Sequence, residues 1–210
     1  MSKPIDLIHC FHNAFRRDSS EIDALSFNIA RDGGNFAPLF MRFQTFGEVL
    51  DYHARGEEAG VFPAIDKLMP LFSRTYVMDH RELDTMVNGL DAISKAPDPL
   101  TTARATAVLN SHLRIHLSKE DAYLYPTLRE GLTDNEQVSI LNIVSSKVPS
   151  EKFPMVIQWL YPLLDIDDQV SVTRQWMSLM PPTVFANLKP LIKKNVAENW
   201  TELTMQIPDL

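Results

Sequence analysis

One stretch of the chain, His53-Ala-Arg-Gly-Glu-Glu-Ala-Gly-Val-Phe-Pro-Ala-Ile65, has a close counterpart further on, His116-Leu-Ser-Lys-Glu-Asp-Ala-Tyr-Leu-Tyr-Pro-Thr-Leu128. In both copies a histidine is followed four residues later by a glutamate, next by a second acidic residue, and then by an aromatic residue and a proline. Residues four apart project from one face of an α-helix, about one turn apart. Each copy therefore directs an imidazole and a carboxylate at one point, and two related copies are what a two-metal site inside a helical bundle requires.

The spacing of the apolar residues predicts an all-α fold. Apolar residues recur at helical intervals in four long segments separated by Gly- or Pro-containing breaks, at residues 4–30, 39–68, 73–94 and 101–129. Four helices of this length with short connections predict an up-down-up-down four-helix bundle. Pro63 and Pro126 fall at equivalent points of the second and fourth segments, where each is expected to bend or end the helix.

The last third of the chain has a different character. It contains no histidine, carries all three tryptophans, and is divided by prolines into three or four shorter helical stretches. We therefore expect a metal-binding bundle at residues 1–132 and a C-terminal helical extension at residues 133–210. Its aromatic residues predict packing, either on the bundle or at a contact between two copies of the chain.

Composition excludes several classes of function. The formal charge of -7 argues against a nucleic-acid partner, which requires a basic face. No apolar run approaches the ~20 residues of a membrane span, and the N-terminus lacks the apolar core of a signal peptide. A single cysteine, Cys10, excludes an intramolecular disulfide and a cysteine-rich zinc or iron–sulfur site. We expect a cytoplasmic protein that binds neither nucleic acid nor a membrane.

The histidines identify the candidate ligands, because all six lie in the four long segments. The first and third segments each supply at least one, and His12 and His80 are the better candidates, since each precedes a repeated histidine by one helix–turn–helix return. Imidazole and carboxylate together suit iron, manganese, zinc or copper better than calcium or magnesium. The predicted metal ligands are His12, His53, Glu57, His80, His116 and Glu120.

In the order of these motifs the chain resembles the hemerythrin-like family, the His-His-Glu cation-binding domain. The family pattern is His, then His-x-x-x-Glu, then His, then His-x-x-x-Glu, and His12-Asn-Ala-Phe-Arg-Arg-Asp18 is similar to its first-helix signature. The resemblance covers about residues 4–130. It implies a four-helix bundle and two iron ions with an oxo or hydroxo bridge, although zinc or manganese is not excluded. It also implies four terminal imidazoles, and Glu57 and Glu120 as bridging ligands.

The chain departs from the oxygen carriers of that family at Asp84. Those carriers have a second histidine four residues after the third-helix histidine, whereas Asp84 occupies that position here. The missing imidazole leaves a coordination position open, which favours small-molecule chemistry over simple reversible carriage.

Other side chains near the same helices leave alternatives open. His112 and His9 are either extra ligands or hydrogen-bonding residues, and a phenolate ligand from one of four tyrosines (Tyr52, Tyr76, Tyr123 and Tyr125) is a further alternative. Glu58 and Asp121 either lie on solvated helix surface or orient a ligand histidine.

We therefore expect a non-haem di-iron protein that binds or reacts with O2, peroxide or nitric oxide, for sensing, carriage or detoxification. One alternative is a di-iron enzyme that decomposes peroxide or oxidises an organic substrate. A second is an iron-responsive interaction module, and a third is a purely structural bundle. The expected partners are a small diatomic ligand or peroxide, with a homodimer through the C-terminal helices as an option.

Overall fold

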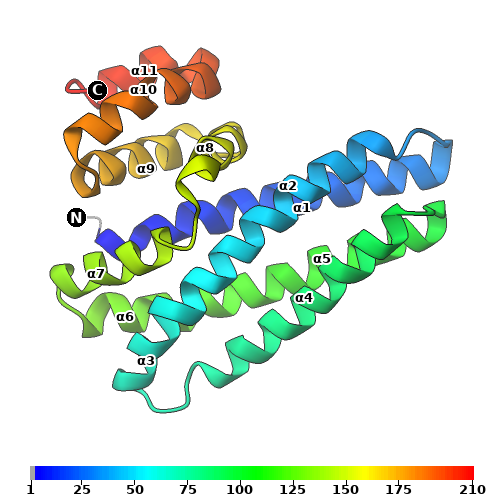
Figure 1. The fold of residues 1–210 in the computed structure, drawn as a ribbon, viewed down its shortest axis with the longest axis horizontal. Helices are drawn as coiled ribbons and strands as arrows, with labels where there is room; N and C mark the ends of the chain where they lie inside the picture. Colours follow the sequence, from blue (N-terminus) through cyan, green and yellow to red (C-terminus); the bar gives the residue numbers. More distant parts are fainter. Residues whose placement is uncertain (1–2) are drawn as a thin grey trace.

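All regular structure in the computed structural model is helical over residues 3–210, which are the residues it describes (Figure 1). The predicted all-α class is therefore confirmed. Four long helices pack along one another as a helical bundle, with α1 against α5 and α5 against α4. They are α1 (Leu7–Asp32), α2 (Ala37–Gly56), α4 (Arg74–Ser94) and α5 (Pro99–Lys119).

The helix ends follow local sequence signals. A 3-10 turn at Pro4–Asp6 precedes α1, which ends where Gly33 adopts a φ of 77° that favours glycine. The helix α5 starts at Pro99, directly after Asp98, whose side chain accepts a hydrogen bond from the Thr101 backbone N–H at 2.8 Å.

Each copy of the repeat contains a π-helical turn that begins at its glutamate, Glu57–Val61 (η2) in the first copy and Glu120–Leu124 (η3) in the second. The short helices α3 (Phe62–Leu68) and α6 (Tyr125–Gly131) then continue the path, with a proline as their second residue. Proline has no N–H to donate to a carbonyl of the preceding turn, so each proline interrupts the hydrogen-bond ladder where the π turn passes into the α-helix. The predicted disturbances thus occur as π turns ahead of the prolines, and such turns are frequent at functional sites.

Five helices follow the bundle: α7 (Asp134–Ser145), α8 (Phe153–Leu160), α9 (Ile166–Leu179), α10 (Pro182–Val196) and α11 (Trp200–Gln206). They gather beside the N-terminal half of α1 in Figure 1, where α7 contacts η2 and α2, α8 contacts α2, and α9 contacts α1. Trp159 is buried and its Nε1–H donates to Asp18 Oδ2 on α1 at 2.6 Å. The helices α7, α8 and α9 therefore pack directly on the helices of the bundle, and α10 and α11 pack on α8 and α9.

Two glycines allow α7 to approach the first copy of the repeat closely. A Cβ atom on Gly56 would lie 2.8 Å from Val144 Cγ1, and one on Gly60 would lie 3.2 Å from Ile143 Cγ2. The equivalent positions in the second copy are Lys119 and Tyr123, whose side chains are half-buried and exposed. Glycine therefore occurs in the copy that contacts α7.

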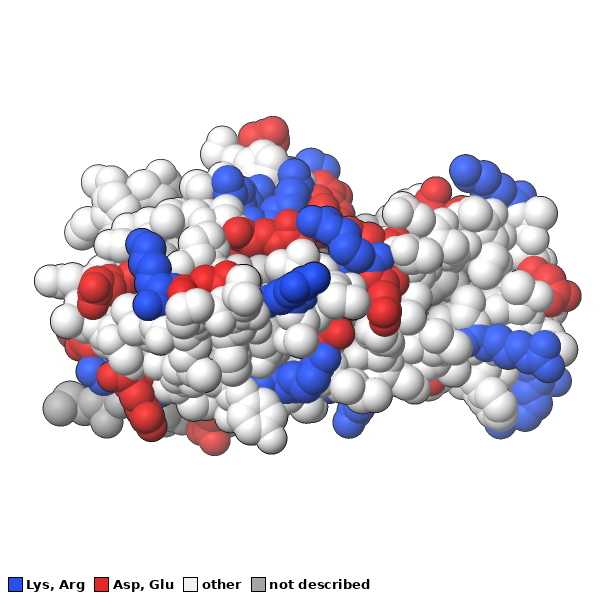
Figure 2. Space-filling view, turned by 90° about the horizontal axis from the view of Figure 1, so that it is seen from below, with Lys and Arg blue, Asp and Glu red and all other residues white. Residues whose placement is uncertain are grey.

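The surface shows mixed charge. On the face drawn in Figure 2, acidic and basic side chains are interspersed rather than gathered in patches of one sign. Among the helices that the structure describes, none has the length and apolar character needed to cross a bilayer.

Candidate metal centre

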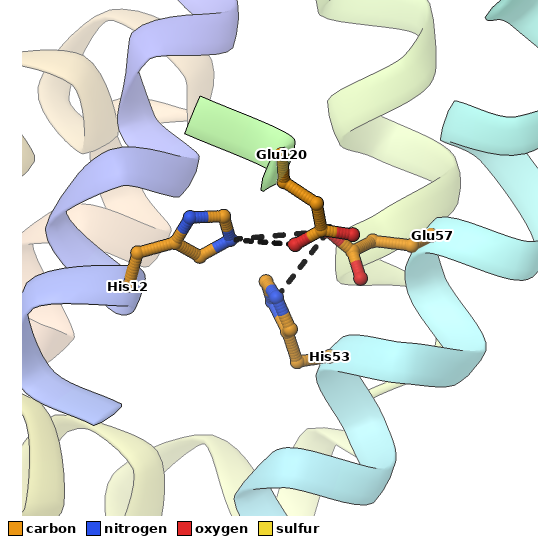
Figure 3. A group of neighbouring side chains, drawn as sticks. All are labelled: His12, His53, Glu57 and Glu120. Carbon is orange, nitrogen blue, oxygen red and sulfur yellow. Dashed lines mark ion pairs between the residues drawn. The ribbon is translucent and has the colours of Figure 1, made fainter. Parts of the chain in front are cut away.

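The six predicted ligand residues converge in the interior of the bundle, from four different helices and the two π turns. They form two groups that share Glu57 and Glu120, and within each group the candidate ligand atoms all lie within 4.8 Å of one another. We call the group with His12 and His53 subsite A (Figure 3), and the group with His80 and His116 subsite B. Both glutamates are fully buried and all four histidines are buried.

Each glutamate places one oxygen in each subsite. Glu57 Oε1 lies 3.3 Å from His53 Nε2 in subsite A, and Glu57 Oε2 lies 3.3 Å from His80 Nε2 in subsite B. Glu120 Oε2 lies 3.5 Å from His12 Nε2, and Glu120 Oε1 lies 3.4 Å from His116 Nε2. The arrangement is that of two cation sites with two shared carboxylates and two imidazoles each.

The polar atoms that face this centre fit a bound metal ion. Five of them are buried and lack a hydrogen-bond partner: His12 Nε2, His53 Nε2, Glu57 Oε2, Glu120 Oε1 and Glu120 Oε2. A buried polar atom without a partner costs about 1–3 kcal/mol. Imidazole nitrogens and carboxylate oxygens are suitable ligands for divalent iron, manganese and zinc, so ions of this class would satisfy these atoms.

Three of the four imidazoles have a carboxylate at Nδ1, the ring nitrogen that points away from the centre. The His12 Nδ1–H donates to Asp121 Oδ1 at 2.8 Å, and His80 Nδ1 lies 3.3 Å from Glu58 Oε1. In each copy the acidic residue after the central glutamate thus contacts the histidine of a neighbouring helix. Such bonds fix the tautomer and the ring orientation of a ligand histidine. Of the two interpretations of Glu58 and Asp121, these contacts favour the orienting one.

Asp79 on α4 holds the ring of His116 on α5, and sequence reasoning missed this residue. Its Oδ2 lies 3.2 Å from His116 Nδ1, and Lys119 forms an ion pair with the same oxygen. Burial opposes ionisation, but the bonds to His116 and Lys119 lower the pKa of Asp79 to about 2. Asp79 lies outside the repeat. Its position directly before the predicted ligand His80 is the one feature of the sequence that could have drawn attention to it.

The charges of the metal-free centre are uneven. Burial raises the pKa of Glu120 well above its ordinary value, and the neighbouring Glu57 carboxylate raises it further. Burial acts on Glu57 in the same direction, but the surrounding imidazoles, His53 first, hold its pKa well below the ordinary value. Burial also lowers the pKa of His53 to about 3. In the metal-free pair of carboxyl groups, the surroundings therefore favour ionisation at Glu57 and protonation at Glu120.

The remaining histidines do not join either subsite. His112 Nε2 lies 3.3 Å from Glu82 Oε2 near the surface, and His9, with 55% of its side chain exposed, lies 3.4 Å from Asp121 Oδ1. Neither residue belongs to the two groups of candidate ligand atoms.

Among the four tyrosines, Tyr125 reaches the centre. Its hydroxyl donates a hydrogen bond to Glu57 Oε1. The Tyr52 hydroxyl donates to Glu48, the Tyr76 hydroxyl donates to the Lys119 carbonyl, and Tyr123 is exposed. Burial raises the pKa of Tyr125 well above its usual value, so the phenol stays protonated.

A cavity of about 320 Å³ between α2 and α4 reaches the centre, with His53, His80 and His116 among its lining residues. It thus touches ligands of both subsites. Asp84, four residues after His80, also lines it, and forms an ion pair with Arg81 at 3.5 Å. The position that departs from the oxygen carriers therefore lies along a cavity through which a small molecule can approach the imidazoles.

A helical bundle with a buried cluster of histidines and glutamates, able to hold a metal ion, defines a metal-binding protein. Residues 3–128 match the hemerythrin HHE cation-binding domain, and the chain belongs to that family. The resemblance stated from the sequence is confirmed.

Curated relatives come from Arabidopsis thaliana. Two zinc finger proteins described as BRUTUS-like are 26% identical over 204 residues and 23% identical over 210 residues, each alignment covering 87% of this chain. Zinc finger protein BRUTUS is 20% identical over 187 residues, covering 85% of this chain. The chain spans only 15–17% of the length of these relatives. No solved structure matches the chain.

The similarity extends past the family domain. Coverage of 87% of the chain cannot be contained in residues 1–128, so the alignments with the BRUTUS-like proteins include part of the C-terminal helices.

Proposed function

We propose that the chain is a hemerythrin-like di-iron protein that binds or reacts with a small diatomic ligand or peroxide. In this proposal residues 1–132 form an up-down-up-down four-helix bundle that holds two iron ions, and residues 133–210 form the helical extension. The proposed ligands are the six residues of subsites A and B, with Glu57 and Glu120 as the bridges. A cytoplasmic location, and a homodimer through the extension, are secondary parts of the proposal.

The observation that carries the proposal is the set of buried nitrogen and oxygen atoms that lack a hydrogen-bond partner, two imidazole nitrogens in subsite A and three oxygens of the shared glutamates. A purely structural core would leave these atoms uncompensated, at about 1–3 kcal/mol each. Imidazole ligands predominate over carboxylates in the set, as in a site for a redox-active transition metal. Bound iron would supply Lewis acidity and one-electron chemistry to the centre.

The residues of the chain have their own tasks in this function. Asp121, Glu58 and Asp79 hold imidazole Nδ1 atoms so that each Nε2 faces the centre. The α2–α4 cavity gives a small ligand a route to both subsites, whereas the helices around it exclude bulk solvent from the buried carboxylates.

Metal content tests the proposal directly. The protein is loaded anaerobically with Fe²⁺, desalted, and analysed for iron per chain, together with His116→Ala and a matched control, His112→Ala, altered one turn earlier on α5. We expect two irons per chain in the wild type and the control, and fewer in His116→Ala. If His116→Ala retains two irons, the ligand assignment is wrong; if the wild type retains none, the whole proposal is wrong.

Reactivity is tested on the same samples. Nitric oxide added to the loaded protein without air, or peroxide added in small excess, should change the absorption spectrum of the wild type. Sustained peroxide consumption would favour the enzyme alternative over a binding protein. If neither reagent changes the absorption spectrum of the iron-loaded protein, a small-ligand function is contradicted.

A second candidate, an iron-responsive interaction module, has one observation in its favour. The helix α7 packs on the π turn that contains Glu57, so a displacement of this turn on metal binding would reach α7 first among the C-terminal helices. Hydrogen exchange tests this candidate: amides of α7 should be protected more strongly in the iron-loaded protein than in the metal-free one.

A further inference from the structure

One difference between the two copies of the repeat is a hydroxyl group beside the metal centre. Phe62 in the first copy and Tyr125 in the second occupy equivalent positions, and both are buried. The Phe62 ring lies 5.1 Å from the His80 ring, and the Tyr125 ring lies 5.4 Å from the His12 ring. Each ring therefore packs on the ligand histidine contributed by a neighbouring helix, and the hydroxyl is the chemical difference between them.

That hydroxyl makes the two shared glutamates unequal. The Tyr125 hydroxyl donates to Glu57 Oε1, the oxygen that faces subsite A. Neither oxygen of Glu120 has a hydrogen-bond partner. Phenylalanine at the equivalent position of the first copy has no group with which to hold Glu120. Glu57 is thus held by a hydrogen bond from a neighbouring side chain, and Glu120 is not.

We propose that Tyr125 is a positioning residue that fixes Glu57 as the rigid bridge of the metal centre and leaves Glu120 as the bridge free to rotate. The inference rests on the proposed metal-binding function. A carboxylate oxygen has two lone pairs, so Glu57 Oε1 accepts the phenol hydrogen and still faces a cation. Because Glu120 has no such hydrogen bond, Glu120 would yield to an entering ligand more readily than Glu57.

The energetic consequence follows from the role of hydrogen bonds behind metal ligands. Removing such a bond typically lowers metal affinity about 10–100-fold. Tyr125→Phe removes the bond to Glu57 and retains the ring that packs on His12, so the loss reports the hydroxyl alone. The variant also makes the two copies of the repeat alike at this position.

The test uses Co²⁺ as the probe, because its visible bands report ligand geometry without any turnover. Affinity is measured by competition with a chromophoric chelator for the wild type, Tyr125→Phe and the matched control Tyr76→Phe. Tyr76 also lies beside a ligand ring, 6.4 Å from that of His116, but its hydroxyl donates to a backbone carbonyl. Circular dichroism of the metal-free proteins establishes that all three fold alike.

We expect Tyr125→Phe to lose at least about tenfold in Co²⁺ affinity and to show shifted bands, with Tyr76→Phe unchanged in both. Wild-type affinity and bands in Tyr125→Phe, or an equal loss in Tyr76→Phe, would overturn the assignment. If the wild type itself fails to bind two Co²⁺ ions, the proposed two-metal function is wrong, rather than the role of Tyr125 within it.

A variant of the other copy keeps the inference testable if Tyr125→Phe does not fold. Phe62→Tyr adds a hydroxyl that can anchor Glu120, and we expect it to raise Co²⁺ affinity about tenfold by the same reasoning. An unchanged or reduced affinity in a folded Phe62→Tyr protein would count against the role of the hydroxyl.

Discussion

Replacing Gly56 with alanine tests whether the C-terminal extension packs on the metal-binding helices as closely as the structure indicates. The added Cβ would lie 2.8 Å from Val144 Cγ1 and 3.2 Å from Val144 Cα. Carbon atoms in favourable contact lie about 3.5–4.0 Å apart, so α7 has to move. Because one of the clashing atoms is backbone, a change of side-chain rotamer cannot relieve the contact.

Two opposing contributions set the size of the effect. Overpacking of a well-packed contact costs about 1–3 kcal/mol. Alanine is favoured over glycine inside a helix by about 1 kcal/mol, which offsets part of that cost. We therefore expect Gly56→Ala to lower the free energy of unfolding by about 1 kcal/mol, or to lower the melting temperature by about 2–4 °C in a chain of this length.

Gly89 provides the matched control. It lies exposed on α4, and a Cβ at this position would meet no atom within 4 Å. Gly89→Ala gains the same helix propensity without the clash, so it should raise the melting temperature by about 2–4 °C. Both variants are measured metal-free by thermal and urea unfolding. If Gly56→Ala is stabilised as much as Gly89→Ala, α7 does not approach Gly56 as described.

Two further predictions concern the metal centre. Asp121→Asn removes the carboxylate that accepts from His12 and should lower metal affinity about 10–100-fold in a chelator competition, whereas Asp84→Asn, which contacts no ligand ring, should not. In the metal-free protein, burial lowers the pKa of His53 from 6.5 to about 3, so below pH 6.5 the unfolded chain binds a proton that the folded chain does not. Through His53, stability should therefore fall as the pH drops from 6.5 toward 3. In urea unfolding at two pH values within this range, the wild type should lose more stability than His53→Leu, or gain less; an equal change in the two proteins would contradict this origin.

The convergence of the candidate ligands could be predicted because it depends on local geometry. A histidine and a glutamate four residues apart share a helix face whatever the rest of the chain does. The duplication then implied a second, related pair, and the helical connections limited which histidines of the other two helices lie opposite. The structure brings together all six residues selected in this way.

The contacts behind the ligands depend on how the helices rotate against one another, which local spacing does not determine. Asp79 reaches His116 from α4, and Tyr125 reaches Glu57 from the opposite copy of the repeat. The sequence gives no sign that Asp79 contacts a ligand, and it offers Tyr125 only as one of four tyrosines near the same helices. The π turns at Glu57 and Glu120 were likewise expected only as disturbances near the prolines, because a π turn depends on which backbone carbonyl an N–H selects.

The parts of the repeat that agree and the parts that differ carry separate information. The shared His-x-x-x-Glu spacing places equivalent ligand atoms in both subsites, and so it predicts two similar metal ions. Two of the differences are Gly56 against Lys119, where α7 packs on one copy, and Phe62 against Tyr125, where a hydroxyl holds one glutamate. Both differences break the symmetry at the same carboxylate, because Gly56 precedes Glu57 and Tyr125 donates to it. Glu57 is thus held on one side by the tyrosine and placed on the turn that α7 covers, so movement within the centre is directed to Glu120.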